Sequence, residues 1–376
     1  MTAFLAECAA FSAALQFVKG CVPPRATIPI LEHIEIIANA GTLVIRATDL
    51  AMDASATCPA EIESAGTITV PGSMLAAMVA KLPKGGEVRI QTEEDGRASV
   101  ICGKSRYQVR TLPAHDFPAR RDLTPVPVRW TMAGADLVEM LSLTRGSVGT
   151  GADRPYLAGV HVHYDRPANT GGSIVAVSTD GHRLVRCTKD APSGAEHIPA
   201  DIIIPSDALR QIDAIAGDGD VEIATDGLRI EFSANGLSFS TALVAGTYPD
   251  YRRLIPQKNG ALFAASADEF GDAVERALVV FSSDIGGAAV TISVDRAALS
   301  ITSSASKGDA GREEVGIDDE GVEGASVKFN GKYLRDALSL WGDAVVSVQQ
   351  SGIGAPVMLT SDARPEMTQL IMPFNR

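Results

Sequence analysis

The sequence lacks the positive charge of a protein that coats nucleic acid. Its 376 residues hold 33 Lys and Arg against 46 Asp and Glu, which gives a net charge of −13. Domains that hold nucleic acid by bulk electrostatics carry a clear basic excess, so the charge argues against that class. Apolar residues make up 45% of the chain, an ordinary share, so the composition is not that of a disordered protein either.

Long apolar runs and cysteine motifs are also missing. No run approaches the roughly 18 residues that cross a bilayer, and Met1–Glu7 has neither the basic region nor the apolar stretch of a signal peptide. Without CxxC spacing, neither a disulfide framework nor a zinc site is indicated. We therefore expect a cytoplasmic protein that binds no membrane and keeps its five thiols reduced and mostly buried. The cysteines are Cys8, Cys21, Cys58, Cys102 and Cys187.

The chain repeats itself about every 125–135 residues, a normal domain size. A strand leading into a short helix recurs at residues 70–83, 204–212 and 329–338, each followed by an alternating strand at 87–90, 220–223 and 344–348. An earlier helix is signalled at 11–15, 137–141 and 270–274. Asp95-Gly96, Asp226-Gly227 and Asn235-Gly236 are typical hairpin turns.

Proline-rich segments at 124–127 and 255–258 separate the repeats. The pattern predicts an α+β fold of three similar domains, each with two helices and two sets of antiparallel strands. We place the domains at residues 1–126, 127–257 and 258–376.

The segment Asp180-Gly181-His182-Arg183 carries the strongest chemical signal. It follows a predicted strand at 174–178, and an imidazole beside a guanidinium could act as a general base next to an anion site. We favour a structured turn instead, in which Asp180 bonds the backbone and Gly181 supplies a permissive conformation.

Other candidate sites are weaker. His161 and His163 lie on one face of a strand and could bind a metal, but no ligand cluster accompanies them and we favour solvent-facing side chains. Asp318-Asp319-Glu320 lacks calcium-loop spacing, which favours a solvated loop. The run 146–151 is glycine-rich but follows a helix and lacks the P-loop ending, which favours a connector. No catalytic signature is present, so we predict no catalytic residue, cofactor or metal.

Several segments together resemble the bacterial DNA polymerase III β subunit, the replicative sliding clamp. They are Thr27–Leu31, Thr48-Asp49-Leu50, Ser105-Arg106-Tyr107, Thr111-Leu112-Pro113, Asp116-Phe117-Pro118, Thr179–Leu184 and Tyr248–Arg253. The resemblance runs from about residue 15 to the C-terminus. It implies a non-catalytic processivity factor that forms a head-to-tail homodimeric ring of six domains around duplex DNA, with two helices per domain lining the hole.

The resemblance also implies a site for partner peptides that carry apolar and glutamine side chains. The partners that the resemblance implies are the DNA polymerase III α subunit, the clamp loader and other proteins with clamp-binding motifs. The residues carried over are Leu157, Thr179, Gly181, His182, Arg183, Leu184, Pro249, Arg253, Leu254, Asn330, Tyr333, Val357, Leu370, Met372 and Pro373. Apolar members would form the concavity, and Arg183 would contribute mainly through its aliphatic stem.

For DNA, the resemblance implies contacts from Arg25 and Tyr156. The sequence departs from the family where Pro155 and Ser73 replace an aromatic and a basic residue. It also ends Met372-Pro373-Phe374-Asn375-Arg376, where the family commonly ends Met-Pro-Met-Arg-Leu. Two alternatives stay open: a clamp paralogue for repair or inhibitor resistance, and a metal-assisted hydrolase that uses His161, His163 and His182.

Overall fold

The computed structural model describes two compact units. Unit 1 comprises Met1–Val138, Pro192–Pro199 and Asp207–Leu243, and unit 2 comprises Glu139–Ala191, Ala200–Ser206 and Val244–Arg376. The residues described are 2–124, 126–166, 171–200, 202–217, 219–256, 260–281, 288–295, 298–305, 308–317 and 321–374.

Six α-helices occur among the described residues, two in each third of the chain, as the repeat predicted. They are α1 (Cys8–Val18), α2 (Gly72–Val79), α3 (Gly134–Arg145), α4 (Leu209–Ile215), α5 (Ala267–Leu278) and α6 (Gly331–Leu338). None of the helices in these ranges is long and apolar enough to span a membrane. All five cysteines are free and buried, as expected.

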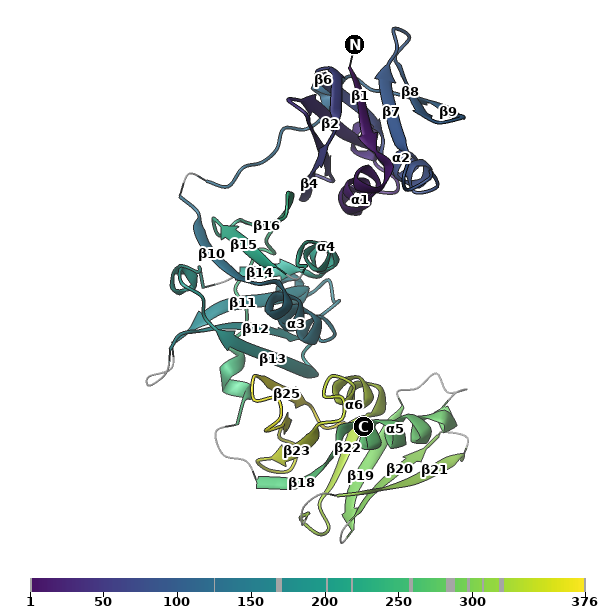
Figure 1. Cartoon of the computed structure of the whole chain (residues 1–376). Coiled ribbons are helices and arrows are strands. Elements are labelled where there is room, and N and C mark those ends of the chain that lie inside the picture. The colour runs from purple at the N-terminus through teal and green to yellow at the C-terminus, as the bar shows by residue number, and fades with distance from the viewer. Residues whose placement is uncertain are drawn as a thin grey trace. The chain divides into compact units, whose positions relative to one another are not determined.

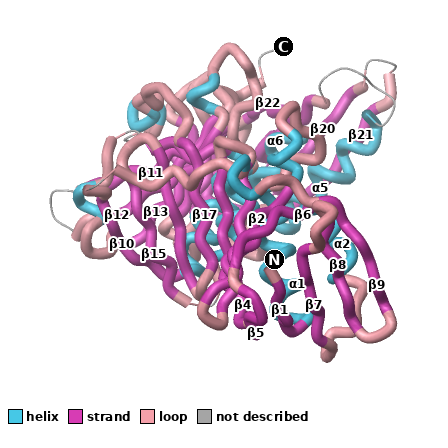
Figure 2. The backbone as a smooth tube through the Cα atoms, turned by 90° about the horizontal axis from the view of Figure 1, so that it is seen from above, coloured by secondary structure: helices cyan, strands magenta, loops and turns pink. Residues whose placement is uncertain are grey.

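Unit 1 contains a five-stranded and an eight-stranded antiparallel sheet. The first has the order β5 (Glu61–Ser64), β1 (Ala3–Glu7), β7 (Glu87–Thr92), β8 (Arg97–Cys102) and β9 (Ser105–Arg110). The second has the order β10 (Val128–Ala133), β15 (Asp220–Thr225), β16 (Arg229–Ala234), β17 (Leu237–Ala242), β4 (Met52–Pro59), β3 (Thr42–Thr48), β2 (His33–Asn39) and β6 (Gly66–Pro71). Figure 2 shows β7, β8 and β9 running side by side.

Unit 2 contains an eight-stranded and a four-stranded antiparallel sheet. The larger has the order β14 (Ile202–Pro205), β11 (Gly159–Asp165), β12 (Ser173–Thr179), β13 (Arg183–Asp190), β25 (Met367–Ile371), β24 (Val357–Thr360), β23 (Val345–Gln350) and β18 (Gly260–Ser266). The smaller has the order β21 (Ala310–Gly316), β20 (Ala298–Ser304), β19 (Ala289–Asp295) and β22 (Ser326–Asn330). Figure 1 shows α5 and α6 side by side, and α5 packs on β20 and β21.

The four sheets are assembled from repeated four-strand sets. One set occurs as β1-β7-β8-β9, β10-β15-β16-β17 and β18-β23-β24-β25, and the other as β6-β2-β3-β4, β14-β11-β12-β13 and β22-β19-β20-β21. Each eight-stranded sheet joins one set of each kind, through β4 to β17 and through β13 to β25. The corresponding strands β9 and β21 are left at sheet edges among the described residues.

The same kind of turn connects β3 to β4, β12 to β13 and β15 to β16. A threonine hydroxyl donates to the carbonyl four residues later, at 2.9 Å from Thr48, 2.7 Å from Thr179 and 2.7 Å from Thr225. The following aspartate accepts two backbone N–H groups. The residue after it has a positive φ: Leu50 at 78°, Gly181 at 89° and Gly227 at 84°. Glycine removes the steric cost of this conformation at two of the three turns.

The join between β4 and β17 contains a buried ion pair. Nη2 of Arg229 lies 2.7 Å from Oδ2 of Asp53 and 3.0 Å from Oγ of Ser240, and both charged side chains are largely buried. Removing one partner of such a pair leaves the other charge uncompensated.

We predict that Asp53→Ala lowers the free energy of unfolding by about 3 kcal/mol, since it leaves Arg229 without its carboxylate. Glu222→Ala is the control, because the pair that Glu222 forms with Arg129 is more than half exposed and contributes less than about 1 kcal/mol. Urea unfolding measures both variants, and equal losses would contradict the prediction.

Candidate functional site

The candidate site is built around the turn between β12 and β13. Asp180 Oδ1 accepts the N–H groups of His182 at 2.9 Å and Arg183 at 3.0 Å, and Gly181 supplies the left-handed residue. The favoured interpretation of this segment as a structured turn is confirmed. Because Asp180 is engaged in holding the turn, the segment presents His182 and Arg183 on a fixed backbone.

Arg183 is held by two carboxylates and a ring. Its Nε lies 3.1 Å from Asp180 Oδ2, and Nη1 lies 3.4 Å from Asp336 Oδ2. The guanidinium carbon is 4.6 Å from the centroid of Tyr333, over the ring face, and the side chain is only 17% exposed. The His182 ring stacks on Tyr333 at 6.0 Å between centroids. The headgroup of Arg183 is therefore already satisfied, which leaves its stem and the neighbouring rings as contact surface.

Three adjoining hollows share Arg183, and we call them together the Arg183 groove. The apolar hollow is lined further by Thr179, Gly181, His182, Leu184, Leu254, Pro356, Leu370 and Met372. The polar hollow, of about 280 Å³, is lined further by Val148, Gly149, Thr150, Gly151, Arg154, Leu157, Asp180, His182 and Tyr333. The third, also about 280 Å³, lies between α3, α6 and the paired strands β13 and β25.

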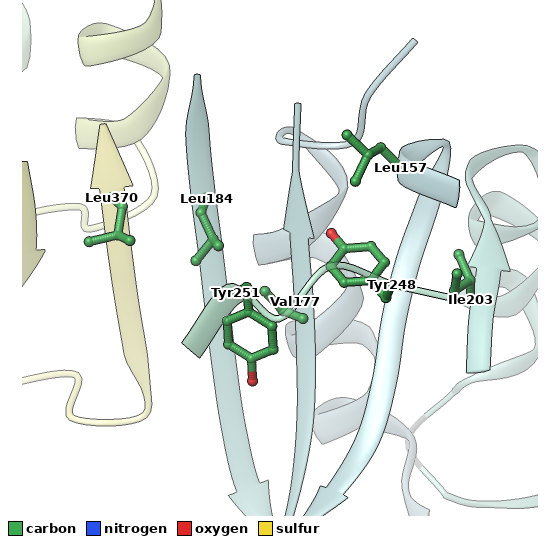
Figure 3. Close-up of a cluster of buried hydrophobic side chains, with 7 residues drawn as sticks. All are labelled: Leu157, Val177, Leu184, Ile203, Tyr248, Tyr251 and Leu370. Atoms are coloured by element: carbon green, nitrogen blue, oxygen red, sulfur yellow. The ribbon is translucent and has the colours of Figure 1, made fainter. Parts of the chain in front are cut away.

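A cluster of buried side chains underlies the groove. Figure 3 shows Leu184 and Leu370 on the neighbouring strands β13 and β25, with Tyr248 and Tyr251 from the segment after β17 and Leu157 beside them. Leu184 and Leu370 are register partners, and both also line the apolar hollow. The groove wall is thus continuous with the core, which fixes its shape.

The C-terminal segment completes the groove. The Met372 N–H donates to the His182 carbonyl at 2.8 Å, which extends the β13–β25 pairing by one bond. The Phe374 N–H donates to the Lys328 carbonyl at 2.7 Å, and Lys328 Nζ lies 5.6 Å from the Phe374 ring centroid. Asn375 and Arg376 lie outside the described residues.

Most residues that the resemblance implied for the peptide site come together in unit 2. The apolar and polar hollows contain Leu157, Thr179, Gly181, His182, Arg183, Leu184, Leu254, Tyr333, Leu370 and Met372. Asn330 caps α6 by accepting the N–H groups of Lys332 and Tyr333, so it positions Tyr333 from beneath.

Besides Asn330, four residues of that set do not line these two hollows. Val357 is fully buried opposite Ile371, and the Arg253 side chain is 85% exposed and paired with Asp250 at 2.8 Å. Pro249 and Pro373 stand in segments next to lining residues. Their part in binding remains a prediction.

Sequence reasoning missed Arg154, Pro356 and Asp336. Asp336 could have been found, because it stands three residues after Tyr333 on α6 and so shares its face. Arg154 and Pro356 lie in irregular segments, and Gly149–Gly151, interpreted as a connector after a helix, also lines the polar hollow.

The expectation that His161 and His163 face solvent was wrong. They are 6% and 4% exposed. His161 stacks on Tyr248 at 4.6 Å, and His163 Nε2 lies 2.8 Å from the Tyr251 hydroxyl. Strand alternation placed both imidazoles on one face, but the segment carrying the two tyrosines covers that face.

The hydrolase alternative needed a bound metal and the side chains of His161, His163 and His182. Among the described residues, which include all three histidines, no group of three or more His, Cys, Asp or Glu could hold a metal ion. Asp318-Asp319-Glu320 lies outside the described residues.

The two residues implied for DNA contact lie in different units. Arg25 is exposed in the segment after α1. Tyr156 is partly buried and packs on the cluster that includes Leu157 and Tyr248.

Three family models of the DNA polymerase III beta subunit match nearly the whole chain: the N-terminal domain at residues 2–121, the central domain at 131–250 and the C-terminal domain at 252–375. The chain belongs to this family of β sliding clamps. It is therefore a non-catalytic DNA clamp of three clamp domains, and the hydrolase alternative is overturned.

Individual relatives agree over the full length. The beta sliding clamp of Caulobacter vibrioides is 30% identical over 375 residues, which cover 98% of each chain, and that of Pseudomonas aeruginosa is 26% identical over 96% of each. The solved sliding clamp of Bartonella birtlesii bound to griselimycin is 29% identical with a TM-score of 0.93, and that of Caulobacter crescentus is 28% identical with a TM-score of 0.91. Both structures and this chain cover one another completely.

The buried histidine beneath the groove predicts acid sensitivity of this clamp. Burial, together with His161 and Arg252, lowers the pKa of His163 from 6.5 to about 4, and the contact with the Tyr164 carbonyl and the Asp165 carboxylate only partly oppose this shift. The folded pKa lies below the unfolded one, so the unfolded chain takes up this proton first as the pH falls. His163 then reduces stability by roughly 1.4 kcal/mol per pH unit between about 6.5 and about 4, and has no effect above that window.

Urea unfolding at pH values from about 7 to about 4.5 measures this slope. His163→Phe should make the pH dependence shallower, whereas His115→Phe, at an exposed position, should leave it unchanged. Identical slopes for the wild type and His163→Phe would contradict the assignment.

Proposed function

We propose that two copies of this clamp close head to tail into a ring around duplex DNA. We further propose that the Arg183 groove binds peptides of the polymerase, the clamp loader and other replication or repair proteins. The observation that carries the groove assignment is the apolar concavity formed by Leu184, Leu254, Leu370 and Met372, beside an Arg183 that two carboxylates hold in place. Such a surface suits an apolar peptide with a few polar groups.

The strand edges support the ring. The chain pairs β4 with β17 and β13 with β25, and the equivalent third pair would be β21 with β9. These two strands are far apart in the chain and remain at sheet edges, where exposed N–H and C=O groups favour pairing. Pairing between subunits gives a heterologous contact, and such contacts generate closed rings when the rotation permits.

Charge on the two edges is complementary. Exposed Arg106 and Arg110 stand on β9, and Glu313 and Glu314 stand on β21. Arg312 also stands on β21 and pairs with Glu314 at 3.0 Å, so β21 has a net charge of −1 against +2 on β9. Opposite charges across paired strands stabilise the pairing and disfavour two identical edges meeting.

Contacts to DNA are proposed to be few and weak. Four exposed cations on or beside α1, α2 and α4 form no ion pair with another described residue: Lys19, Lys81, Lys84 and Arg210. Arg276 and Arg335 instead pair with Glu313 and Asp336. We propose that these free cations, with Arg25 and Tyr156, face the duplex, and that the salt dependence of binding is shallow.

The assignment leaves three further proposals. The chain acts in the cytoplasm, where the chromosome is replicated, and its domains divide near residues 126 and 257. A specialised copy for repair or inhibitor resistance is the second candidate, on the observation that Phe374 stands where the family carries methionine and is anchored to Lys328. Complementation of a clamp-depleted strain separates a housekeeping copy from a specialised one.

We predict that His182→Ala or Arg183→Ala weakens binding of a peptide with apolar and glutamine side chains at least about tenfold, because each removes part of the groove wall. Arg183→Met should retain most of the affinity, since it keeps the aliphatic stem. Fluorescence anisotropy measures the affinity, and the exposed Arg129→Ala is the matched control. Unchanged affinity in His182→Ala and Arg183→Ala would refute the groove assignment while leaving the ring untested by this route.

A second prediction concerns the ring. Clamp loaded on circular DNA should remain bound and should be lost after linearisation, because retention is topological. Arg106→Glu with Arg110→Glu should shorten retention on circles by weakening the proposed β9 edge, whereas Arg129→Glu should not. Gel filtration of clamp–DNA complexes measures retention, and equal loss from circular and linear DNA would contradict the proposed ring.

A further inference from the structure

Two buried thiols meet in unit 1. Cys8 is the first residue of α1, and Cys102 is the last residue of β8. Their sulfur atoms are 3.8 Å apart, although 94 positions separate them in the sequence. The other three cysteines, all within the described part of the chain, have no second sulfur as a hydrogen-bond partner.

The sulfur pair lies just beneath the surface. Cys8 is 1% exposed and Cys102 is 7% exposed. The Cys8 N–H donates to the Gly86 carbonyl at 2.9 Å, and the Gly86 N–H closes a turn on Pro83 at 2.9 Å. A β-carbon on Gly86 would lie 3.3 Å from the Cys102 sulfur and 3.8 Å from the Cys8 sulfur. Gly86 therefore lies close to both sulfurs, and the residues on either side of it, Gly85 and Glu87, are exposed.

We propose that Cys8 and Cys102 form a redox-responsive dithiol that a low-molecular-weight disulfide, such as oxidised glutathione, converts to a disulfide bond in the folded protein. The sulfurs need to approach from 3.8 Å to about 2.05 Å. Side-chain rotation, together with a small movement of the turn at Pro83–Gly86, brings them together.

The chemistry balances in two exchanges. The Cys102 thiolate, at the more exposed position, attacks one sulfur of oxidised glutathione. This forms a mixed disulfide between Cys102 and one glutathione and releases the other glutathione as a thiolate. The Cys8 thiolate then attacks the Cys102 sulfur and displaces the second glutathione. Two protein thiols are oxidised, one glutathione disulfide is reduced to two thiols, and the two protons leave to the released thiolates.

The surroundings of the two sulfurs make their oxidation slow. Burial, the contact with Cys102 and the nearby carboxylates of Glu7 and Glu87 raise the pKa of Cys8 to about 11. Few molecules carry the Cys8 thiolate near neutral pH, so the second exchange limits the rate. Oxidation should therefore accelerate as the pH rises, and it should respond to a sustained oxidising poise rather than to a brief pulse.

The test is peptide mapping after oxidation of the native clamp. Reduced protein is incubated without denaturant in oxidised glutathione, remaining thiols are blocked with N-ethylmaleimide, and the protein is digested with trypsin without reductant. The expected product joins Met1–Lys19, which contains Cys8 alone, to Ala98–Lys104, which contains Cys102 alone. Three of the five cysteines should stay titratable.

Matched variants assign the bond. Cys8→Ser and Cys102→Ser should each abolish the joined peptide, and Cys8→Ser should trap one glutathione on Cys102. Cys58→Ser is the control, because Cys58 is equally buried but has no sulfur neighbour, its thiol facing the Pro59 carbonyl. Oxidation should also raise the Tm of the wild type and of Cys58→Ser only, since the new bond closes a long loop in the unfolded chain.

Three results would overturn the proposal: five titratable thiols after equilibration with oxidised glutathione, glutathione on Cys102 of the wild type without the joined peptide, or a joined peptide that forms only in urea. The mapping is independent of the proposed ring, so failure of the ring leaves its outcome unchanged. The bond would anchor the hairpin of β8 and β9. Only an effect of this anchoring on the subunit contact depends on the proposed ring.

Discussion

The pairing of β13 with β25 is the constraint on which the site depends. It joins strands from the central and C-terminal clamp domains into one eight-stranded sheet. The backbone N–H and C=O groups that β13 and β25 would otherwise expose at two sheet edges are therefore hydrogen-bonded to each other. The same pairing sets Leu184 beside Leu370, and its continuation ties Met372 to the His182 carbonyl. The groove is therefore a by-product of how two domains share a sheet, and its walls cannot shift independently of the core beneath them.

Within that frame, Arg183 shows how a charged residue becomes a contact surface. Asp180 and Asp336 neutralise its headgroup, and Tyr333 covers one face of the guanidinium. Because the guanidinium of Arg183 is already held in place, the side chain loses little further conformational freedom when a ligand binds. This reduces the entropic cost of binding. The same two carboxylates occupy the guanidinium that an anion site would need. The segment that most resembled a catalytic motif in the sequence is thus a rigid turn, and we propose that it recognises partner peptides.

Much of this could be predicted from the sequence, because the deciding signals were local or repeated. Helical spacing and turn residues located six helices, and Asp180 with Gly181 specified the turn that the structure contains. The burial of His161 could not be predicted, since alternation fixes which residues share a face but not what covers that face. Arg154 and Pro356 also escaped, because irregular segments carry no period. The pairing of β4 with β17 joins residues nearly two hundred positions apart, which no local pattern reports.

The charge of −13 acquires a different meaning once the protein is a clamp. A protein that holds DNA by affinity must offset the charge of the duplex, and its net charge then opposes its function. A closed ring needs no such affinity, and strong phosphate contacts would slow its movement along the duplex. In the proposed ring, retention of DNA therefore depends on the contact between subunits rather than on attraction to phosphates, because a ring that opens has little attraction left to retain the duplex.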